Sequence, residues 1–259
     1  MRPAELWELG DYAKVGDRWA AAGEELVDRV VRPGDRVLDV ACGTGAVAIA
    51  AAAAGAEVTG LDVAPTLLAV AAKRADAKRL AVRWVEADMT AMPESDAGFD
   101  RVLSAFGAMF AADPGAMAAE LVRVCAPGGV IAVAAWMPDS PFGRLRPTMV
   151  RHLPPGVPSG PTIEVWGDPE RVREFFAGLP VTVRTPESTV DVRWPSLDAA
   201  VEEITTLVPG SVGARAAIEP TGAWPTVCDE VRAILADAGR AEGDRFVLPV
   251  GFLTTLAQR

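Results

Sequence analysis

The chain has few of the residues that metal, redox or nucleic-acid chemistry requires. It holds one histidine, and its three cysteines, Cys42, Cys125 and Cys228, show no C-x-x-C spacing. Histidine and cysteine supply most transition-metal sites, so we expect no metal site, and isolated cysteines fit a reducing compartment. The formal net charge of −10 and the lack of any Lys/Arg cluster argue against a nucleic-acid partner.

Long apolar runs are also missing. The longest run of small residues, 46–54, lies between two glycines and is too short to span a bilayer. The N-terminal stretch MRPAELWELGDY lacks the apolar core of a signal peptide. We therefore expect a cytoplasmic globular protein with no membrane partner.

The first half of the chain alternates between strand and helix patterns. Apolar strands are predicted at 36–41, 57–62, 81–88, 99–106 and 130–137, and helices at 45–55, 64–80 and 115–129. Strands that alternate with helices in this way indicate a buried parallel sheet with helices on both faces.

The second half has a different texture. Seven prolines within 138–161 predict a long loop or a lid with broken helices. Helices are predicted at 168–179, 196–208 and 226–239, a strand pair at 181–194 and a last strand at 243–257. We expect one domain in three segments: an N-terminal helical segment with the core (1–137), a lid and acceptor insertion (138–180), and a part that completes the sheet (181–259).

A glycine-rich turn, ACGTG, follows the first predicted strand and opens a helix. Gly43 permits a tight turn, and Gly45 lets a ligand approach the backbone beside the helix N-terminus. Asp39 lies at the end of the strand, four residues before Gly43. Its carboxylate repels a pyrophosphate but attracts an ammonium or sulfonium, which favours a positively charged ligand.

Two further strands end in acidic residues. Asp62 ends the second strand, where a carboxylate can accept hydrogen bonds from both hydroxyls of a ribose. Asp88 and Met89 follow the third strand and could hold an adenine through its amino group and its apolar face. The competing ligand is a dinucleotide, because residues 43–48 satisfy the permissive fingerprint G-x-G-x-x-A.

Successive motifs of the chain resemble those of the class I S-adenosylmethionine-dependent methyltransferases, in particular the ubiquinone/menaquinone-biosynthesis-like branch that acts on small molecules. These motifs are VLDVACGTG, VTGLD, VEADMTAMP, FDRVLSAFGAMF and ELVRVCAPGGVIAVAAW. The resemblance implies a three-layer Rossmann-like fold. It has a mostly parallel seven-stranded sheet with an antiparallel closing strand, and a lid after the fifth strand.

The resemblance also implies a cofactor, S-adenosyl-L-methionine, and S-adenosyl-L-homocysteine as its product. The residues at matching positions are Tyr12, Asp39, Ala41, Gly43, Gly45, Asp62, Val63, Asp88, Met89, Ser104 and Phe106. Tyr12 would close over the cofactor, or it could instead attach the N-terminal helix to the core. The implied activity is methyl transfer to oxygen, nitrogen or carbon of a small-molecule acceptor, and we expect a role in secondary metabolism. The alternatives are a non-methylating cyclase or scaffold with this fold, and an NAD(P)-dependent oxidoreductase.

The acceptor half of the chain offers candidates rather than a motif. His152 is the one histidine and the candidate general base, with Tyr12, Asp113 and Glu164 as weaker ones. Three arginines of the lid could bind an anionic acceptor or simply be solvated: Arg144, Arg146 and Arg151. Apolar residues could line an acceptor pocket or form the core of the lid: Trp136, Met137, Phe142, Leu145, Met149 and Trp166.

Overall fold

A single mixed sheet runs through the computed structural model, which describes residues 3–259. Its strands follow the order β3-β2-β1-β4-β5-β9-β6, and β7 and β8 also pair with β9. The strands are β1 (Arg36–Val40), β2 (Glu57–Asp62), β3 (Val82–Glu86), β4 (Phe99–Ala105), β5 (Cys125–Trp136), β6 (Thr182–Arg184), β7 (Glu187–Trp194), β8 (Arg240–Glu242) and β9 (Arg245–Gln258). The predicted fold class is confirmed.

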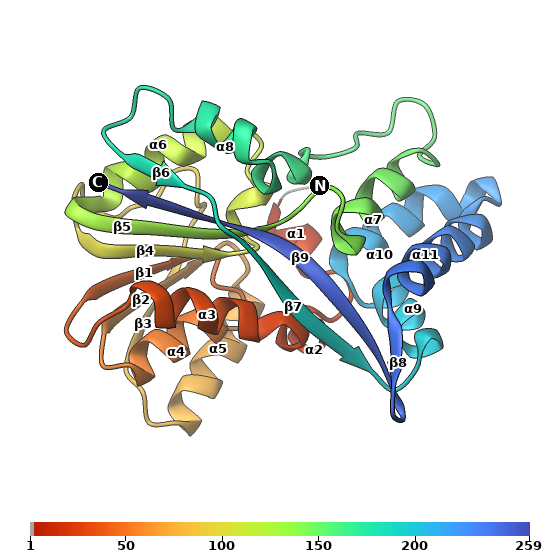
Figure 1. Cartoon of the computed structure of the whole chain (residues 1–259), viewed down its shortest axis with the longest axis horizontal. Coiled ribbons are helices and arrows are strands. Elements are labelled where there is room, and N and C mark those ends of the chain that lie inside the picture. The colour runs from red at the N-terminus through yellow and green to blue at the C-terminus, as the bar shows by residue number, and fades with distance from the viewer. Residues whose placement is uncertain (1–2) are drawn as a thin grey trace.

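Strands β1 to β5 form the parallel half of the sheet, and helices cover both of its faces. One face is covered by α3 (Ala20–Val30), α4 (Ala46–Ala53) and α5 (Pro65–Ala77). The other face is covered by α6 (Pro114–Val124) and α8 (Pro169–Phe175) (Figure 1). Because both faces are covered, the central strands are almost continuously apolar, as the sequence pattern predicts.

The antiparallel half is larger than predicted. The path through the sheet has the expected seven strands, but β7 and β8 bring the total among residues 3–259 to nine. The strands predicted as a pair at 181–194 do not pair with each other, since β6 and β7 both lie along one edge of β9. Arg184 lies opposite Leu256 and Glu187 opposite Leu253, so the register continues across the break at Pro186, which has no N–H to donate.

The proline-rich segment contains a helix where a loop or broken helices were predicted. Helix α7 (Pro141–Val150) begins at Ser140, whose hydroxyl accepts a hydrogen bond from the Gly143 amide at 3.1 Å. Pro141 lies in the first turn, where a missing N–H has no cost, although Pro147 lies inside the helix. The short helix η3 (Ile163–Gly167) follows. In the core, α6 ends at Val124, earlier than predicted, because β5 already begins at Cys125.

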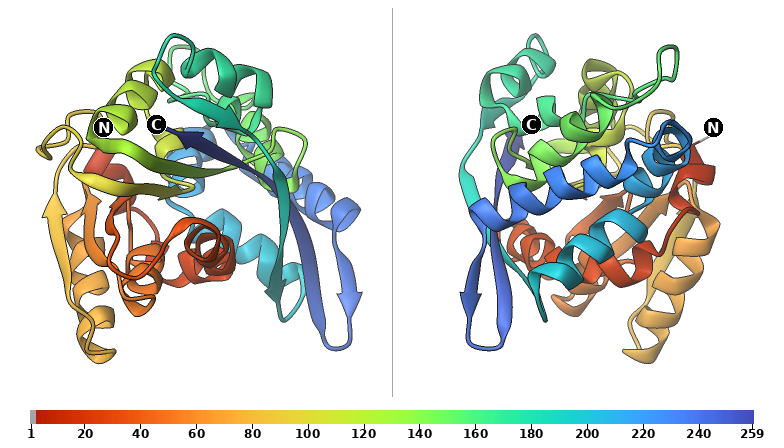
Figure 2. Two further views of the ribbon diagram at one scale, coloured as in Figure 1. Left: turned by 60° about the vertical axis from the view of Figure 1, so that its left-hand side comes forward. Right: turned by 90° about the vertical axis from the view of Figure 1, so that its right-hand side faces the viewer.

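A group of helices lies at one end of the molecule. It consists of α7 together with α9 (Leu197–Thr206), α10 (Pro209–Ile218) and α11 (Trp224–Ala238) (Figure 2). The N-terminal segment, with α1 (Pro3–Trp7), α2 (Tyr12–Val15) and the short helix η1 (Gly16–Trp19), connects this group to the core. The Asp11 amide donates to the Leu207 carbonyl at 2.9 Å. Within residues 3–259 no helix has both the length and the apolarity needed to cross a membrane.

Candidate active site

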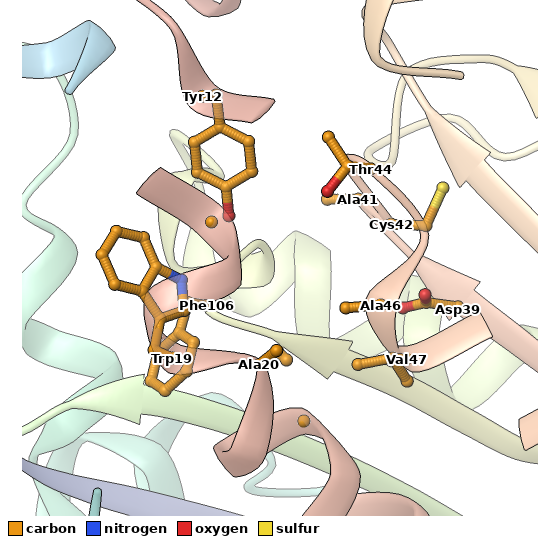
Figure 3. A pocket seen from close by; sticks show the side chains of 13 residues that line it. Tyr12, Trp19, Ala20, Asp39, Ala41, Cys42, Thr44, Ala46, Val47 and Phe106 are labelled. Carbon is orange, nitrogen blue, oxygen red and sulfur yellow. The ribbon is translucent and has the colours of Figure 1, made fainter. Parts of the chain in front are cut away.

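A pocket lies at the carboxyl ends of β1 and β4, where open parallel sheets bind their ligands. Its walls come from the glycine turn after β1, from α2, η1 and α3, and from the end of β4. Figure 3 shows the rings of Tyr12, Trp19 and Phe106 facing the glycine turn across the pocket. Of the residues predicted to bind the cofactor, Tyr12, Asp39, Ala41 and Phe106 line this pocket.

The glycine turn has the conformation that its sequence predicts. Gly43 and Gly45 have positive φ angles of 53° and 83°. A Cβ on Gly43 would lie 3.1 Å from the Tyr12 ring. A Cβ on Gly45 would lie 2.9 Å from both Ala71 and Trp84. The first glycine therefore lets Tyr12 cover the turn, and the second lets α5 and β3 pack closely against it.

Asp39 is a buried carboxylate at the wall of the pocket. The residue is 1% exposed, and Oδ2 accepts a hydrogen bond from the Ala48 amide of α4 at 2.9 Å. Burial raises the pKa of Asp39 to about 8, while the Ala48 amide opposes this rise and the nearby Asp62 adds to it. Such a carboxylate is poised to ionise against a ligand that brings a positive charge.

Asp62 shapes the same turn from the end of β2. Oδ2 accepts from the Gly43 amide at 2.8 Å and Oδ1 from the Ala64 amide at 2.9 Å. Burial also raises the pKa of this carboxyl, against the effect of those backbone hydrogen bonds. Each carboxylate oxygen can accept a second hydrogen bond, so ribose binding at Asp62 stays a prediction beside this visible structural role.

Tyr12 combines the two roles considered for it. Its ring covers Gly43 and meets Trp7 edge-on at 5.3 Å, so it both borders the pocket and attaches the N-terminal segment to the core. Burial raises its pKa to about 12, although the hydrogen bond to the Trp19 side chain lowers it. The phenol therefore stays neutral and is poorly suited to act as a base at neutral pH.

Phe106 and Ser104 lie close in sequence but differ in position. Phe106, with a positive φ of 60°, lines the pocket and stacks on Trp136 with ring centroids 3.6 Å apart. The Ser104 hydroxyl is fully buried inside the fold, where it donates to the Val40 carbonyl at 2.8 Å and accepts from the Ala108 amide at 2.9 Å. Ser104 thus supports the pocket floor from behind.

The residues predicted for the adenine lie in the loop after β3. Asp88 is exposed and shapes this loop, because its Oδ1 accepts from the amide of Thr90 at 2.8 Å and from its hydroxyl at 2.7 Å. Met89 is half-buried against the core, and Val63 is half-buried directly after Asp62. None of the three lines the pocket at Tyr12, so their contacts with adenine remain predictions.

The lid candidates have partners of their own. His152 Nε2 lies 3.1 Å from Glu230 Oε2 of α11, and His152 is not among the residues that line the pocket. The lid arginines form ion pairs: Arg144 with Asp237, Arg146 with Glu164, and Arg151 with Glu230. Asp113 accepts from the Ala116 amide and so caps α6. The contacts of Arg144, Arg151 and His152 join the lid to α11, and the pair of Arg146 with Glu164 lies within the lid.

Several residues of the site were not predicted from the sequence. Trp19 and Thr44 line the pocket, and Trp84 packs on both Gly45 and Gly60. Arg74 of α5 donates to the Thr44 hydroxyl at 3.1 Å. Thr44 lies inside the motif and could have been included for that reason. Trp19, Trp84 and Arg74 reach the turn only through the tertiary fold.

Known proteins identify the family. Residues 37–129 match the family model described as a methyltransferase domain. The chain is 42% identical over 191 residues to an uncharacterized protein of Mycobacterium tuberculosis, covering 73% of this chain and 69% of that protein. It is 35% identical over 183 residues to the demethylmenaquinone methyltransferase of Thermus thermophilus, covering 64% of this chain and 82% of that enzyme. The chain belongs to the class I S-adenosylmethionine-dependent methyltransferases.

The fold of this methyltransferase is shared with solved relatives of low sequence identity. Geranyl diphosphate C-methyltransferase from Streptomyces coelicolor, in complex with S-adenosyl-L-homocysteine, has a TM-score of 0.54 at 17% identity. The match covers 93% of this chain and 76% of that one. The cofactor of this methyltransferase is S-adenosyl-L-methionine.

The pocket fits this cofactor on its own chemistry. Asp39, which lines the pocket, offers a buried carboxyl group to the ammonium of the methionine moiety. The amides of Ala46 and Val47, the first two of α4, have no partner within the helix and can donate to a bound ligand, whereas the Ala48 amide already donates to Asp39. An acidic wall suits this charged nucleoside better than a pyrophosphate, in agreement with the family and against the dinucleotide alternative.

Proposed function

We propose that this methyltransferase transfers the methyl group to a planar, apolar small molecule bound against aromatic rings beside the pocket. The supporting observation is a set of eight rings in mutual contact, called the aromatic cluster: Trp7, Tyr12, Trp19, Phe106, Phe110, Trp136, Phe142 and Phe252. Tyr12, Trp19 and Phe106 belong to both the cluster and the pocket wall.

The geometry of the cluster suits a flat ligand. Trp19 meets Trp136 edge-on at 5.9 Å and Phe142 at 5.6 Å, and these contacts join the N-terminal segment to β5 and α7. Aromatic rings attract other rings in stacked or edge-to-face arrangements, beyond the effect of apolar burial. Trp166 packs instead on Phe175 and Phe176 under α8, so we assign it to the core rather than to the acceptor site.

The charges around the site also favour a neutral acceptor. Within residues 3–259, the side chains that line the pocket include no lysine, arginine or histidine. The lid arginines, which could have bound an anionic acceptor, form ion pairs with acidic residues. The name of the Thermus relative supports the same class, because demethylmenaquinone carries a planar apolar ring.

When bound, S-adenosylmethionine would supply a methyl group activated by the positive charge on its sulfur. The residues of the chain contribute position and exclusion of water. Asp39 holds the ammonium, Tyr12 covers the glycine turn, and Phe106 with Trp136 provides an apolar floor. Holding two reactants in line can lower a barrier by about 7–11 kcal/mol in favourable cases.

The general-base role of His152 stays a prediction, relevant to acceptors that must lose a proton. Its contact with Glu230 supports a different role, the attachment of the lid to α11. The substitutions His152→Gln and Glu230→Gln distinguish the two roles. A base is worth about 100-fold or more in rate, so His152→Gln alone would lower kcat by that factor. If both substitutions lower kcat by the same small factor, His152 attaches the lid to α11 and is not a base.

The test of the proposed function is product formation from a panel of acceptors. The purified protein is incubated with S-adenosylmethionine and either hydroxylated aromatic rings and quinols, or aliphatic amines and carboxylates of similar size. We expect S-adenosylhomocysteine and a methylated product only with the aromatic acceptors. Preference for charged aliphatic acceptors would contradict the proposal. Conversion of an acceptor without S-adenosylhomocysteine would indicate the non-methylating alternative.

A further inference from the structure

Arg74 of α5 connects the glycine turn to the N-terminal segment. Its Nη1 donates to the Thr44 hydroxyl at 3.1 Å, and Thr44 lines the pocket. Its two terminal nitrogens also pair with the Asp17 carboxylate of η1, at 2.6 Å and 3.0 Å, and Nη2 donates to the Ala13 carbonyl at 3.1 Å. A single guanidinium thus lies where the turn and the N-terminal segment meet.

The pocket presents an unbalanced set of charges to an amino-acid ligand. The methionine end of the cofactor carries an ammonium and a carboxylate. Asp39 can pair with the ammonium, but none of the pocket-lining side chains among residues 3–259 is a cation that could pair with the carboxylate. Arg74 reaches this wall through its hydrogen bond to Thr44, one residue from Gly43. Its guanidinium has a planar array of donors that suits a carboxylate.

We infer that Arg74 is a cofactor-binding residue that attracts the methionine carboxylate at Thr44, while Asp39 holds the ammonium. This inference rests on the proposed function. In the structure the guanidinium pairs with Asp17, whose side chain is 55% exposed, whereas that of Arg74 is 31% exposed. Asp17 therefore holds the guanidinium in place at the turn and competes with the cofactor carboxylate for it.

The N-terminal segment has a second anchor that does not involve Arg74. Arg18 Nε and Nη2 donate to the two oxygens of Glu203 in α9 at 2.7 Å and 2.6 Å. The Arg18 guanidinium also lies 5.5 Å from the Trp194 ring centroid. Loss of the pair between Arg74 and Asp17 therefore leaves η1 attached, so Arg74 can be substituted without releasing the segment.

The test compares two ligands that differ only in the carboxylate. Calorimetry measures the affinities for S-adenosylhomocysteine and for decarboxylated S-adenosylhomocysteine. We expect Arg74→Met to weaken binding of S-adenosylhomocysteine about tenfold, which corresponds to about 1.4 kcal/mol, and to change binding of the decarboxylated ligand less than about twofold. Arg74→Lys should retain part of the preference for S-adenosylhomocysteine over the decarboxylated ligand. Arg171→Met on α8 is the control at a surface arginine.

Asp17→Asn separates recognition from attachment. This variant removes the negative charge that pairs with Arg74 but leaves the guanidinium, so we expect it to bind S-adenosylhomocysteine at least as well as the wild type. The inference is overturned if Arg74→Met weakens both ligands equally or neither, or if Asp17→Asn loses affinity as Arg74→Met does. A wild-type protein that binds neither ligand would overturn the proposed function itself.

Discussion

Asp39 holds one carboxylate oxygen against the backbone and lines the pocket with the rest of its side chain. Because Oδ2 accepts from the Ala48 amide, an asparagine can keep that contact through its amide oxygen while losing the charge. We predict that Asp39→Asn weakens binding of S-adenosylhomocysteine by about 10-fold to 100-fold, since hydrogen bonds to charged groups contribute about 1.5–3 kcal/mol. Calorimetry on the purified variant measures the loss.

The matched control for this prediction is Asp139→Asn, at an exposed carboxylate outside the pocket. Its affinity should equal that of the wild type. An unchanged affinity in Asp39→Asn would show that the ammonium is held elsewhere.

Asp39 also couples stability to pH. Its pKa in the fold is about 8, whereas the ordinary value of an aspartate is about 3.9. Between these pH values the folded state keeps a proton that the unfolded state has lost, so the contribution of this group falls as pH rises through the window. We predict that Asp39→Asn without cofactor has a higher Tm than the wild type near pH 8, by a few degrees, since about 1 kcal/mol shifts Tm by about 2–4 °C at this size.

The difference should shrink as the pH approaches 5, because only a small part of the interval between the two pKa values of Asp39 has then been crossed. The folded state has therefore lost little of the stability that protonated Asp39 contributes. Thermal scans of the wild type, Asp39→Asn and Asp139→Asn across pH 5–9 give the comparison. A difference in Tm that does not depend on pH would contradict the buried, protonated state of Asp39.

At the scale of elements, the turn between β1 and α4 is held by packing as well as by backbone conformation. Gly45 has a φ of 83°, and α5 and β3 leave no room for its Cβ because Ala71 and Trp84 would both lie 2.9 Å away. Gly34 has nearly the same φ of 85°, but nothing lies within 4 Å of its Cβ position. An alanine at either position would therefore meet the same left-handed backbone strain, but only at position 45 would it also collide with neighbouring side chains.

We predict that Gly45→Ala lowers the free energy of unfolding by about 2–4 kcal/mol, the sum of left-handed strain and overpacking. Gly34→Ala should lower the free energy of unfolding by about 1 kcal/mol, because it introduces only the left-handed strain. Chemical denaturation of both variants measures the difference. Equal losses would mean that the contacts of Gly45 with α5 and β3 do not restrict it.

The elements near the glycine turn could be predicted because their signals are local. The turn ACGTG, the acidic strand ends and the alternation of strands with helices are all read within a few residues, and β1, α4 and β2 follow them. Helix α7 was not predicted, because Pro147 indicates a break in a helix. The helix forms nonetheless, and Ser140 caps its N-terminus. Helix α10 was missed as well, since Gly210 and Gly213 weaken its helical pattern.

At the scale of the whole molecule, the site depends on contacts between distant parts of the chain. Arg74 meets Asp17 across 57 residues, and Arg18 meets Glu203 across 185. No periodicity or motif reports such pairs, so the sequence predicted the glycine turn and Asp39 but neither Trp19 in the wall nor the arginines around η1. Contacts from α9 and from α5 both hold η1, which borders the pocket.

The last prediction concerns this connection between the N-terminal segment and the C-terminal helices. Arg18 and Glu203 form a two-point ion pair with partly buried side chains, and Glu203 Oε1 also accepts from the Trp194 indole at 2.8 Å. In a double-mutant cycle of Arg18→Met and Glu203→Gln we expect an interaction energy of about 1–2 kcal/mol, within the range for residues of one network.

Arg18→Met should also raise hydrogen exchange in residues 11–19 and weaken S-adenosylhomocysteine binding, because the segment that holds Tyr12 and Trp19 over the glycine turn then loses its ion pair with α9. The control cycle uses Arg29 and Glu25, a pair on the surface of α3 whose interaction energy should be about 0.3–0.5 kcal/mol. If the Arg18 cycle gives no more than this control and exchange in residues 11–19 is unchanged, the C-terminal helices do not hold the pocket closed.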